Sequence, residues 1–324
     1  MKKKSLKKFI PEVCIAVLNW NGREHLKILI PSLLDAVEYY PGKARILILN
    51  NPSPHDDIAW LHLTFPSVDT VNSPDNDYLY SYNWLMPQLE ESFVVLLNND
   101  LKVAADFLES LLEPFENPNI FAVGACSLEW GGSEVTSAAY RLGMHHGWPY
   151  FDGFQTKNAA FSLYAVGGFF AVDRLKFLEI GGFDRLFHPA YGEDADLCLR
   201  AWLRGWRTVY QPKSIVWHRE GASWDGEQAD KRAYLMTISH YLVSCRYCRK
   251  WRDRLMRWIY LPILGRQRKK AGDLDWAKAI KEARSRWSQR RRSALKFQFN
   301  RKSLDKSLAM IGQSCSETDS FSDE

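Results

Sequence analysis

Three short polar clusters in this sequence combine carboxylates with amides. They are the stretches 50–57 (NNPSPHDD), 98–100 (NND) and 191–197 (YGEDADL), and a histidine, His218, follows the apolar run SIVW. Hard oxygen ligands suit Mg²⁺ or Mn²⁺, which bind one or two carboxylates together with substrate phosphates. We therefore expect Asp100 to be a metal ligand and His218 to be the candidate second ligand.

The cluster at 191–197 places three acids, Glu193, Asp194 and Asp196, within four positions at the start of a predicted helix. Capping of the helix dipole explains one of these acids, Asp194 or Asp196. It explains all three less well, because crowded like charges repel and raise one another's pKa. A carboxylate with a raised pKa at the mouth of a site is a candidate general base.

The elements that must position these clusters are strands and helices in alternation. The apolar runs 12–18, 44–50 and 93–97 are typical of strands buried on both faces, and each is followed by polar residues. A turn would explain the NND stretch alone, since Asn and Asp are common turn residues. The alternation instead favours an α/β fold, with a Rossmann-like, mostly parallel sheet and helices on both faces. In such sheets ligands bind beyond the carboxyl ends of the strands.

Charge divides the chain. Residues 246–302 contain 20 Lys or Arg against 4 Asp or Glu, which gives this segment a net charge of +16. Because the whole chain has a formal net charge of +5, the other residues together have a net charge of −11. We predict a basic tail at 1–10, one α/β domain at 11–240, a basic amphipathic helical extension at 241–302 and a disordered acidic tail at 303–324. Within the first domain, residues 25–40 have the spacing of a helix. Pro31 is expected either to lie near an early turn of this helix or to break it.

No apolar run is long enough for a transmembrane helix, and the basic start of the chain lacks a cleavage site of the signal-peptide type. The six cysteines are scattered. Cys245 and Cys248 form a lone CxxC pair without a second pair or a histidine at zinc-finger spacing, so a zinc site is not expected. The cysteine pattern suits a reducing cytoplasm.

The order of these motifs resembles that of an inverting GT-A glycosyltransferase of family two, in its rhamnosyltransferase-like branch that builds bacterial cell-surface glycans. The resemblance runs from about Glu12 to Trp251. It is carried by VCIAVLNWNGREHL, ILILNNPSPHDD, NDYLYSYNWLM and FVVLLNNDLKV, and most strongly by the ordered set GGFD, GEDADL, RGW and a strand that ends in His218.

The resemblance implies transfer of a hexosyl or deoxyhexosyl group from a UDP-, dTDP- or GDP-sugar to a glycan, with Mg²⁺ or Mn²⁺ as cofactor. Asp100 and His218 would bind the metal, Asp194 would be the general base, and Glu193 and Asp196 would orient the acceptor or the helix. The residues expected to bind the nucleotide sugar are Asn19, Asn21, Arg23, Asn50, Asn76, Asn83, Asn98 and Asn99.

The chain departs from the family pattern at two places. Asn50 replaces the usual Asp at the end of the second strand, where Asp56 or Asp57 could compensate, and NND holds one carboxylate instead of two. A catalytically silent homologue that binds a nucleotide sugar or glycan is therefore the alternative hypothesis. The processive signature Gln-x-x-Arg-Trp is absent, which favours the addition of one sugar per encounter.

Two further segments suggest partners. Residues 143–154 (GMHHGWPYFDGF) offer Trp148 and Tyr150 as acceptor-stacking aromatics or, equally, as a lid packed onto the body, whereas His145 and His146 are expected to be exposed. Bases interleaved with Trp and Ile in 246–302 are typical of an anchor on an anionic membrane surface. Nucleic-acid binding is the rival but leaves the acidic clusters unexplained. We expect no nucleic-acid partner, a lipid-linked glycan acceptor, and a cytoplasmic protein at the inner face of the membrane.

Overall fold

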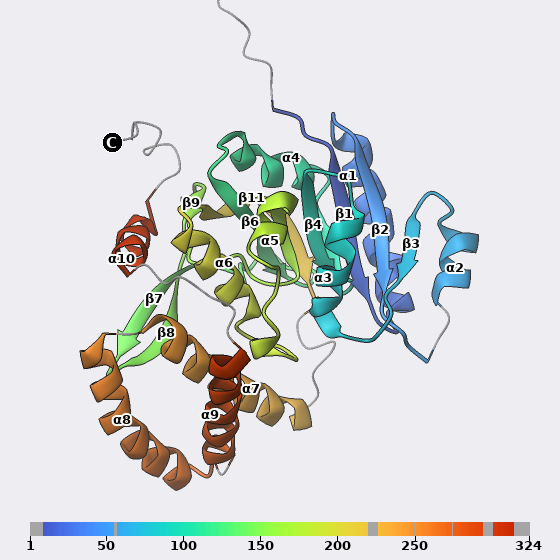
Figure 1. The fold of residues 1–324 in the computed structure, drawn as a ribbon. Helices are drawn as coiled ribbons and strands as arrows, with labels where there is room; N and C mark the ends of the chain where they lie inside the picture. Colours follow the sequence, from blue (N-terminus) through green and yellow to red (C-terminus); the bar gives the residue numbers. More distant parts are fainter. Residues whose placement is uncertain are drawn as a thin grey trace, which may run out of the picture.

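The structure is a computed structural model that describes residues 9–54, 57–219, 226–248, 250–273, 275–293 and 301–313. A curved mixed sheet runs through the molecule, with helices packed around it and a group of C-terminal helices to one side (Figure 1). In the described part of the chain the strand order is β3-β2-β1-β4-β10-β6-β11-β5, with β9 on β11, and a separate hairpin is formed by β7 and β8. The α/β prediction is confirmed.

The strands correspond to the apolar runs of the sequence and end at the polar clusters. Their bounds are β1 Val13–Asn19, β2 Ala44–Asn50, β3 Asp69–Asn72, β4 Phe93–Asn98, β5 Leu101–Val103, β6 Ile120–Glu129, β7 Ala139–His145, β8 Trp148–Phe154, β9 Ala160–Phe161, β10 Phe169–Asp173 and β11 Arg207–His218.

The helices cover the sheet and build the C-terminal region. Their bounds are α1 Arg23–Tyr39, α2 Asp57–Thr64, α3 Ser81–Leu85, α4 Phe107–Leu112, α5 Arg174–Glu179, α6 Glu193–Leu203, α7 Gly226–Tyr247, α8 Trp251–Lys270, α9 Trp276–Ser293 and α10 Arg301–Met310. Pro31 lies inside α1 and does not break it.

The sheet contains two parallel stretches, the four strands from β3 to β4 and the pair of β6 and β11, separated by an antiparallel strand. β3, β2, β1 and β4 pair in parallel, as expected of alternating strands and helices. β10 then inserts antiparallel between β4 and β6, and β5 and β9 pair antiparallel with β11. The sheet is therefore more mixed than the sequence predicted, because an apolar run signals a buried strand but carries no sign of its direction.

Both faces of the sheet are buried, as the apolar strands predict. In β1, Ile15 and Val17 belong to the cluster with the helix residues Leu29 and Phe107, whereas Cys14 and Ala16 belong to a second cluster with Tyr82, Leu85, Phe177 and Leu197. Successive side chains of a strand point to opposite faces, so one strand feeds both clusters. Helices packed on both faces fix the position of the sheet, and they therefore also fix the positions of the strand ends.

The C-terminal segment is part of the fold rather than a separate appendage. α7 runs through the expected domain boundary between residues 240 and 241, and it packs along α9. The prediction of disorder from residue 303 is wrong for the residues that the structure describes, because α10 continues to Met310 and Gly312 N donates to Phe161 O (2.9 Å) at the sheet edge. The rest of both predicted tails, 1–8 and 314–324, lies outside the described residues.

Among the described residues, no helix has both the length and the apolar character needed to cross a membrane.

Candidate active site

Asp100 and His218 meet at one edge of the sheet. Asp100 lies two residues after the end of β4, and His218 is the last residue of β11, which pairs with β5 so that His218 lies opposite Leu101. His218 Nε2 lies 3.5 Å from Asp100 Oδ2, and Arg219 N donates to Asp100 O (3.1 Å). The structure thus brings together two residues that are more than a hundred positions apart in the chain.

The chemistry of this pair fits a divalent cation. Asp100 is 8% exposed, and its second carboxylate oxygen, Oδ1, is buried without a hydrogen-bond partner. A buried carboxylate oxygen without a partner is costly unless something charged or polar binds it. The described residues contain no group of three or more His, Cys, Asp or Glu side chains that could hold a metal, here or elsewhere, so this pair would depend on further ligands from the substrate. A carboxylate with one further ligand matches the mode in which a metal shares its coordination with substrate phosphates.

A row of amides lines the carboxyl ends of the four parallel strands. Asn99 Nδ2 donates to Asn19 Oδ1 (2.8 Å), Asn19 Nδ2 to Asn50 Oδ1 (2.8 Å), and Asn50 Nδ2 to Asn72 Oδ1 (3.0 Å). Asn19 is fully buried and Asn50 nearly so. These two side chains therefore fix the relative position of the strand ends instead of presenting their own amides to a ligand.

Asp57 does not compensate for the amide at position 50. Its carboxylate accepts from Asn19 Nδ2 (3.1 Å), Gly22 N (3.2 Å) and Arg23 Nε (3.3 Å), so it braces the turn after β1. Asp57 is completely buried in this role. Asp56, the other candidate, lies outside the described residues.

The remaining residues expected at the nucleotide differ in accessibility. Asn21, which has φ +50°, and Asn76 are exposed, and Arg23 is partly exposed with its guanidinium 5.4 Å from the Trp60 ring centroid. Asn51 was not predicted: it donates to Asn76 Oδ1 (3.2 Å) and accepts from two serine hydroxyls. The position of Asn51 directly after Asn50, at the end of a predicted strand, is the feature of the sequence that could have indicated this role.

Asn83 has a structural role that excludes the predicted one. Its Nδ2 donates to Phe183 O (2.9 Å) and its Oδ1 accepts from Phe183 N (2.8 Å). Both ends of the amide are occupied by one backbone residue of the Gly-Gly-Phe-Asp turn. Asn83 therefore ties α3 to that turn and is not placed to bind a nucleotide.

The start of α6 presents Asp194 to the sheet. Gly167 N donates to Asp194 Oδ2 (3.0 Å), and Ala195 N donates to Asp194 Oδ1 (2.7 Å). Gly192, the residue before the helix, has φ +83°, and a Cβ there would lie 1.9 Å from Ser239 Oγ, so only glycine fits. Burial raises the pKa of Asp194, while the hydrogen bonds from Gly167 N and Ala195 N oppose that rise.

Glu193, the neighbour of Asp194, has fewer polar partners than Asp194 has. It is 6% exposed, and its Oε2 is buried without a hydrogen-bond partner. Burial, followed by the charge of Asp194, raises the pKa of Glu193 well above its usual value. The pair therefore favours a neutral Glu193 beside a charged Asp194, a division of protonation states that is common where two acids do different tasks.

Asp196 points the other way, into a buried ionic network. Arg246 Nη1 and Arg200 Nε (2.8 Å) donate to its carboxylate, together with Tyr247 OH (2.7 Å). Burial alone would raise the pKa of Asp196, but the two guanidinium groups hold it below the usual value. The expectation that Asp196 contacts an acceptor does not fit this geometry, because its side chain is fully buried.

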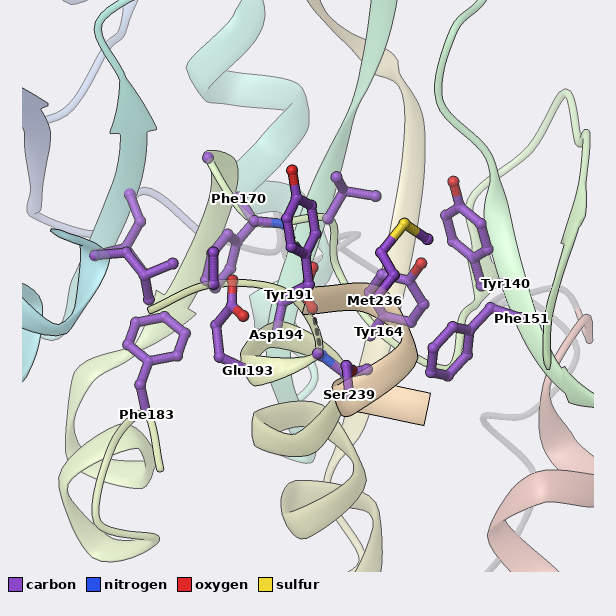
Figure 2. Close-up of a pocket in the computed structure, with 18 of the residues that line it drawn as sticks. Tyr140, Phe151, Tyr164, Phe170, Phe183, Tyr191, Glu193, Asp194, Met236 and Ser239 are labelled. Carbon is purple, nitrogen blue, oxygen red and sulfur yellow. Dashed lines mark hydrogen bonds between the residues drawn. The ribbon is translucent and has the colours of Figure 1, made fainter. Parts of the chain in front are cut away.

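A cavity of about 600 Å³ opens in front of Glu193 and Asp194. Figure 2 shows the two acids between Phe170 and Phe183 on one side and Tyr140, Phe151 and Tyr164 on the other. This combination of a mostly aromatic wall with a few charged groups is typical of a site for a small ligand.

The cavity joins the acids to the strand that leads to Asp100. Asn98 and Gly168 line it, and Asn98 N donates to Gly168 O (2.8 Å). Gly168 has φ +99°, and a Cβ there would lie 2.5 Å from Asn98 Nδ2. The short turn Gly167-Gly168 therefore contacts both Asp194 and the end of β4, two residues before Asp100.

The aromatic residues of the β7–β8 hairpin divide between two roles. Tyr150 lines the cavity and is 47% exposed. Trp148 instead packs on the C-terminal helices, with its ring 6.1 Å from His240 and in contact with the cluster of Leu261, Trp276 and Ile280. Trp148 is therefore a packing residue, and the acceptor prediction fits only Tyr150. His145 and His146 are exposed, as predicted.

One face of α7 forms a cavity wall that the sequence analysis missed. Arg232, Met236, Ser239 and His240 line the cavity and have the spacing of one helix face. Burial lowers the pKa of His240 to about 4, so its imidazole is neutral at neutral pH. The spacing reveals a common face, but only the fold shows that this face meets Asp194.

Comparisons with known proteins bear on the family and the fold of this chain. Residues 11–234 match the family described as glycosyltransferase-like family 2. A Caenorhabditis elegans protein described as probable N-acetylgalactosaminyltransferase 8 is 28% identical over 138 residues, which is 39% of this chain and 33% of that protein. The chain thus spans about a third of the length of this curated relative.

Two solved structures share the fold. GalNAc-T7 with UDP, GalNAc and Mn²⁺ superposes with a TM-score of 0.55 and 14% identity, covering 71% of this chain and 49% of that one. The mannosyltransferase PcManGT of Pyrobaculum calidifontis, in complex with GDP-Man and Mn²⁺, gives 0.54 and 14%, covering 93% and 80%. At this identity the likeness concerns the fold. Since the family match covers most of the chain, this protein belongs to glycosyltransferase family 2 and has a GT-A fold.

Proposed function

We propose that this protein transfers one sugar from a nucleotide-sugar donor to a glycan acceptor, with inversion at the sugar carbon. The observation that carries the proposal is the position of Asp194, which is held by two backbone N–H groups at a cavity walled by aromatic residues. The family and the fold agree with this activity.

The chemical step needs a base and a stabilised leaving group. The acceptor oxygen attacks the sugar carbon, the bond from that carbon to the donor phosphate breaks, and the acceptor's proton passes to the Asp194 carboxylate. Asp194 suits this task because burial raises the pKa of its carboxyl group, which makes the carboxylate a stronger base. Neutral Glu193 beside it can donate a hydrogen bond to a sugar hydroxyl without adding a second negative charge.

Asp100 and His218 are the residues that would hold a divalent metal, Mg²⁺ or Mn²⁺. When bound, such a metal stabilises the negative charge that develops on the leaving diphosphate. The buried unpartnered oxygen of Asp100 supports this assignment, as does the presence of Mn²⁺ with UDP or GDP-Man in the two related structures. The amide row at the strand ends would lie under the nucleotide, with Asn21, Arg23 and Asn76 as the accessible contacts.

Replacing Asp100 or His218 with alanine should lower the metal-dependent affinity for UDP or GDP by about tenfold or more, since every 1.4 kcal/mol of lost interaction is a factor of ten. Titration calorimetry with the nucleotide, with and without Mn²⁺, measures this. Asp152→Ala and His145→Ala are matched controls, because both residues are exposed in the β7–β8 hairpin. Unchanged metal-dependent affinity in both site variants would remove the pair from the metal site.

The acceptor is proposed to be a lipid-linked glycan of cell-surface polysaccharide or lipopolysaccharide assembly, reached from the cytoplasmic side of the membrane. Aromatic faces stack on sugars, and Tyr150 and Phe151 are two of the aromatic side chains that line the cavity. The net charge of +16 in residues 246–302 supports an anionic membrane surface as partner.

A panel of UDP-, dTDP- and GDP-sugars with Mn²⁺ or Mg²⁺ tests the proposed activity. We expect one donor to raise the melting temperature in a metal-dependent way and to be hydrolysed slowly without an acceptor. Asn50, in place of an acid, is the observation that favours a silent homologue. Metal-dependent binding of a donor without any turnover in the presence of glycan acceptors would support that alternative.

The rate of transfer should fall on acidification at a higher pH than an ordinary aspartate would give. Transfer needs the charged form of Asp194, so the rate drops as the pH falls through its pKa, which burial raises above the usual value of about 3.9. Because Glu193 and Asp194 interact, the profile reports the pair. The dependence of kcat/KM on pH measures this, and an acid limb centred near pH 4 would contradict it.

A further inference from the structure

Helix α8 presents a stripe of large apolar side chains to solvent. Trp251 is 69% exposed and Trp258 is 76% exposed, and Leu255, Ile259 and Ile263 are each more than 40% exposed. Such a set on one helix is unusual, because scattered single apolar residues are the normal surface pattern and contiguous apolar patches mark interaction sites.

The spacing shows that these side chains share a face. Trp251, Leu255, Trp258 and Pro262 follow at intervals of four, three and four residues, which places them in one row along the helix. Ile259 and Ile263 lie beside that row. Leu261, at the border of that row, packs with Trp276 and Ile280 of α9, and Tyr260 on the opposite side of α8 has its ring 5.5 Å from that of His145 in the β7–β8 hairpin. The helix is therefore attached to the protein by one side and exposes the other.

Charge distinguishes the occupants of this face. Residues 251–270 contain seven Lys or Arg and one acid, and four of the bases, Arg266, Arg268, Lys269 and Lys270, are exposed at the end of the helix. A second copy packed on this face would bring like charges together. An anionic lipid surface instead pairs these bases with headgroups and accepts the Trp and Ile side chains below them, as amphipathic interfacial helices do.

Other bases of the C-terminal segment have internal partners. Arg246 and Arg290 both donate to Asp184 Oδ2 (2.7 and 2.9 Å), and Arg286 contacts Glu282 and His188 O. These guanidinium groups stabilise the fold and are not available to lipid. Deleting the whole segment would therefore disturb the body as well, and α8 is the element to vary.

We propose that α8 is the membrane-docking helix, lying flat on anionic lipid with Trp251, Leu255 and Trp258 inserted. The inference deepens, and rests on, the proposed membrane partner. α8 also lies against the turn of the β7–β8 hairpin, where a Cβ on Gly147 would be 2.3 Å from Asp253 O. Tyr150 and Phe151 of the same hairpin line the cavity, so a lipid-linked acceptor would meet the cavity next to the docking helix.

The test is flotation of the full chain with vesicles of phosphatidylcholine alone and with vesicles that also contain phosphatidylglycerol. The double variant Trp251→Ser/Trp258→Ser should bind the anionic vesicles at least about tenfold more weakly than the parent, because burial of one large apolar side chain is worth a factor of this size. Leu63→Ser is the matched control: Leu63 is 87% exposed on α2, on the far side of the sheet from α8 (Figure 1).

Binding of the parent should weaken as salt rises from 0.1 M to 1 M, where the Debye length shrinks from about 10 Å to about 3 Å. Equal flotation of parent and double variant would overturn the proposal, as would binding that ignores the anionic lipid. A parent dimer that the double variant loses in sedimentation would assign the face to a second copy, and displacement from vesicles by duplex DNA at physiological salt would assign it to nucleic acid. Transfer to a water-soluble acceptor should survive in the double variant, so failure of docking and failure of the proposed chemistry are separate results.

Discussion

Replacing Asp194 with asparagine should lower the rate of sugar transfer by roughly 10²–10⁴-fold, which is the usual contribution of a general base. The amide has nearly the shape of the carboxylate, but it cannot take the acceptor's proton. Nucleotide affinity should change little, because the proposed metal ligands Asp100 and His218 are untouched. Interactions made only in the transition state affect the rate and not the binding of substrate. Initial rates and calorimetry on the same preparations give both quantities.

A control must show that this variant keeps its fold, because the Asp194 carboxylate accepts hydrogen bonds from the backbone N–H groups of Gly167 and Ala195. An asparagine retains one carbonyl oxygen, so one of these bonds is weakened and the turn could shift. A melting curve shows whether the variant is folded, and Glu193→Gln, which imitates the neutral acid, should have a much smaller effect on the rate. A folded Asp194→Asn protein with transfer within about tenfold of the parent would exclude Asp194 as the base.

Replacing Arg246 with methionine should lower the free energy of unfolding by about 3 kcal/mol. Loss of one member of a buried ion pair typically costs about 3–5 kcal/mol, because the partner's charge stays buried. Arg246 is 7% exposed and bridges Asp196 of α6 to Asp184 of the Gly-Gly-Phe-Asp turn. After the change Arg200 still donates to Asp196, and Arg290 still donates to Asp184. We therefore expect a loss at the lower end of this range.

Arg204→Met provides the comparison for Arg246. Arg204 pairs with Glu179, and both side chains are about half exposed, so its loss should change stability by less than about 1 kcal/mol. Urea unfolding of the three proteins measures the difference. The parent should also lose stability as the pH falls below the unfolded pKa of an aspartate, about 3.9, because the guanidinium groups hold the pKa of Asp196 below that value. Equal effects of the two arginine substitutions would show that the network adds nothing beyond a surface pair.

Much of the site could be predicted from local sequence because parallel strands end at a common edge. The apolar runs located β1, β2 and β4, and the polar residues after them indicated where a ligand would bind. Asp100 and His218 were predicted to lie together on this basis, and the structure places them 3.5 Å apart. The direction of β10 and the mixed second half of the sheet could not be predicted, because strand polarity depends on the path of the connecting chain.

The errors concern side-chain direction. Asp194 and Asp196 are two positions apart on one helix, so their side chains diverge and cannot both face one cavity. The sequence contained that constraint but not which acid faces inward, since the choice depends on Arg246, fifty positions later. Asn83 was misassigned for a related reason, and for the same reason the sequence left acceptor contact and packing as equal alternatives for Trp148. Their partners, Phe183 and the helices α8 and α9, are distant in the chain and carry no local sign of the contact.

The most direct test of the central claim is the configuration of the sugar that the enzyme first releases or transfers, read by proton NMR before the anomers equilibrate. The donor alone is enough for this measurement, since water can take the place of the acceptor. A single displacement with Asp194 as the base predicts that the first-formed product has the opposite anomeric configuration to the donor, and that Asp194→Asn forms it at least about a hundredfold more slowly. A first-formed product with the donor's own configuration would contradict the account.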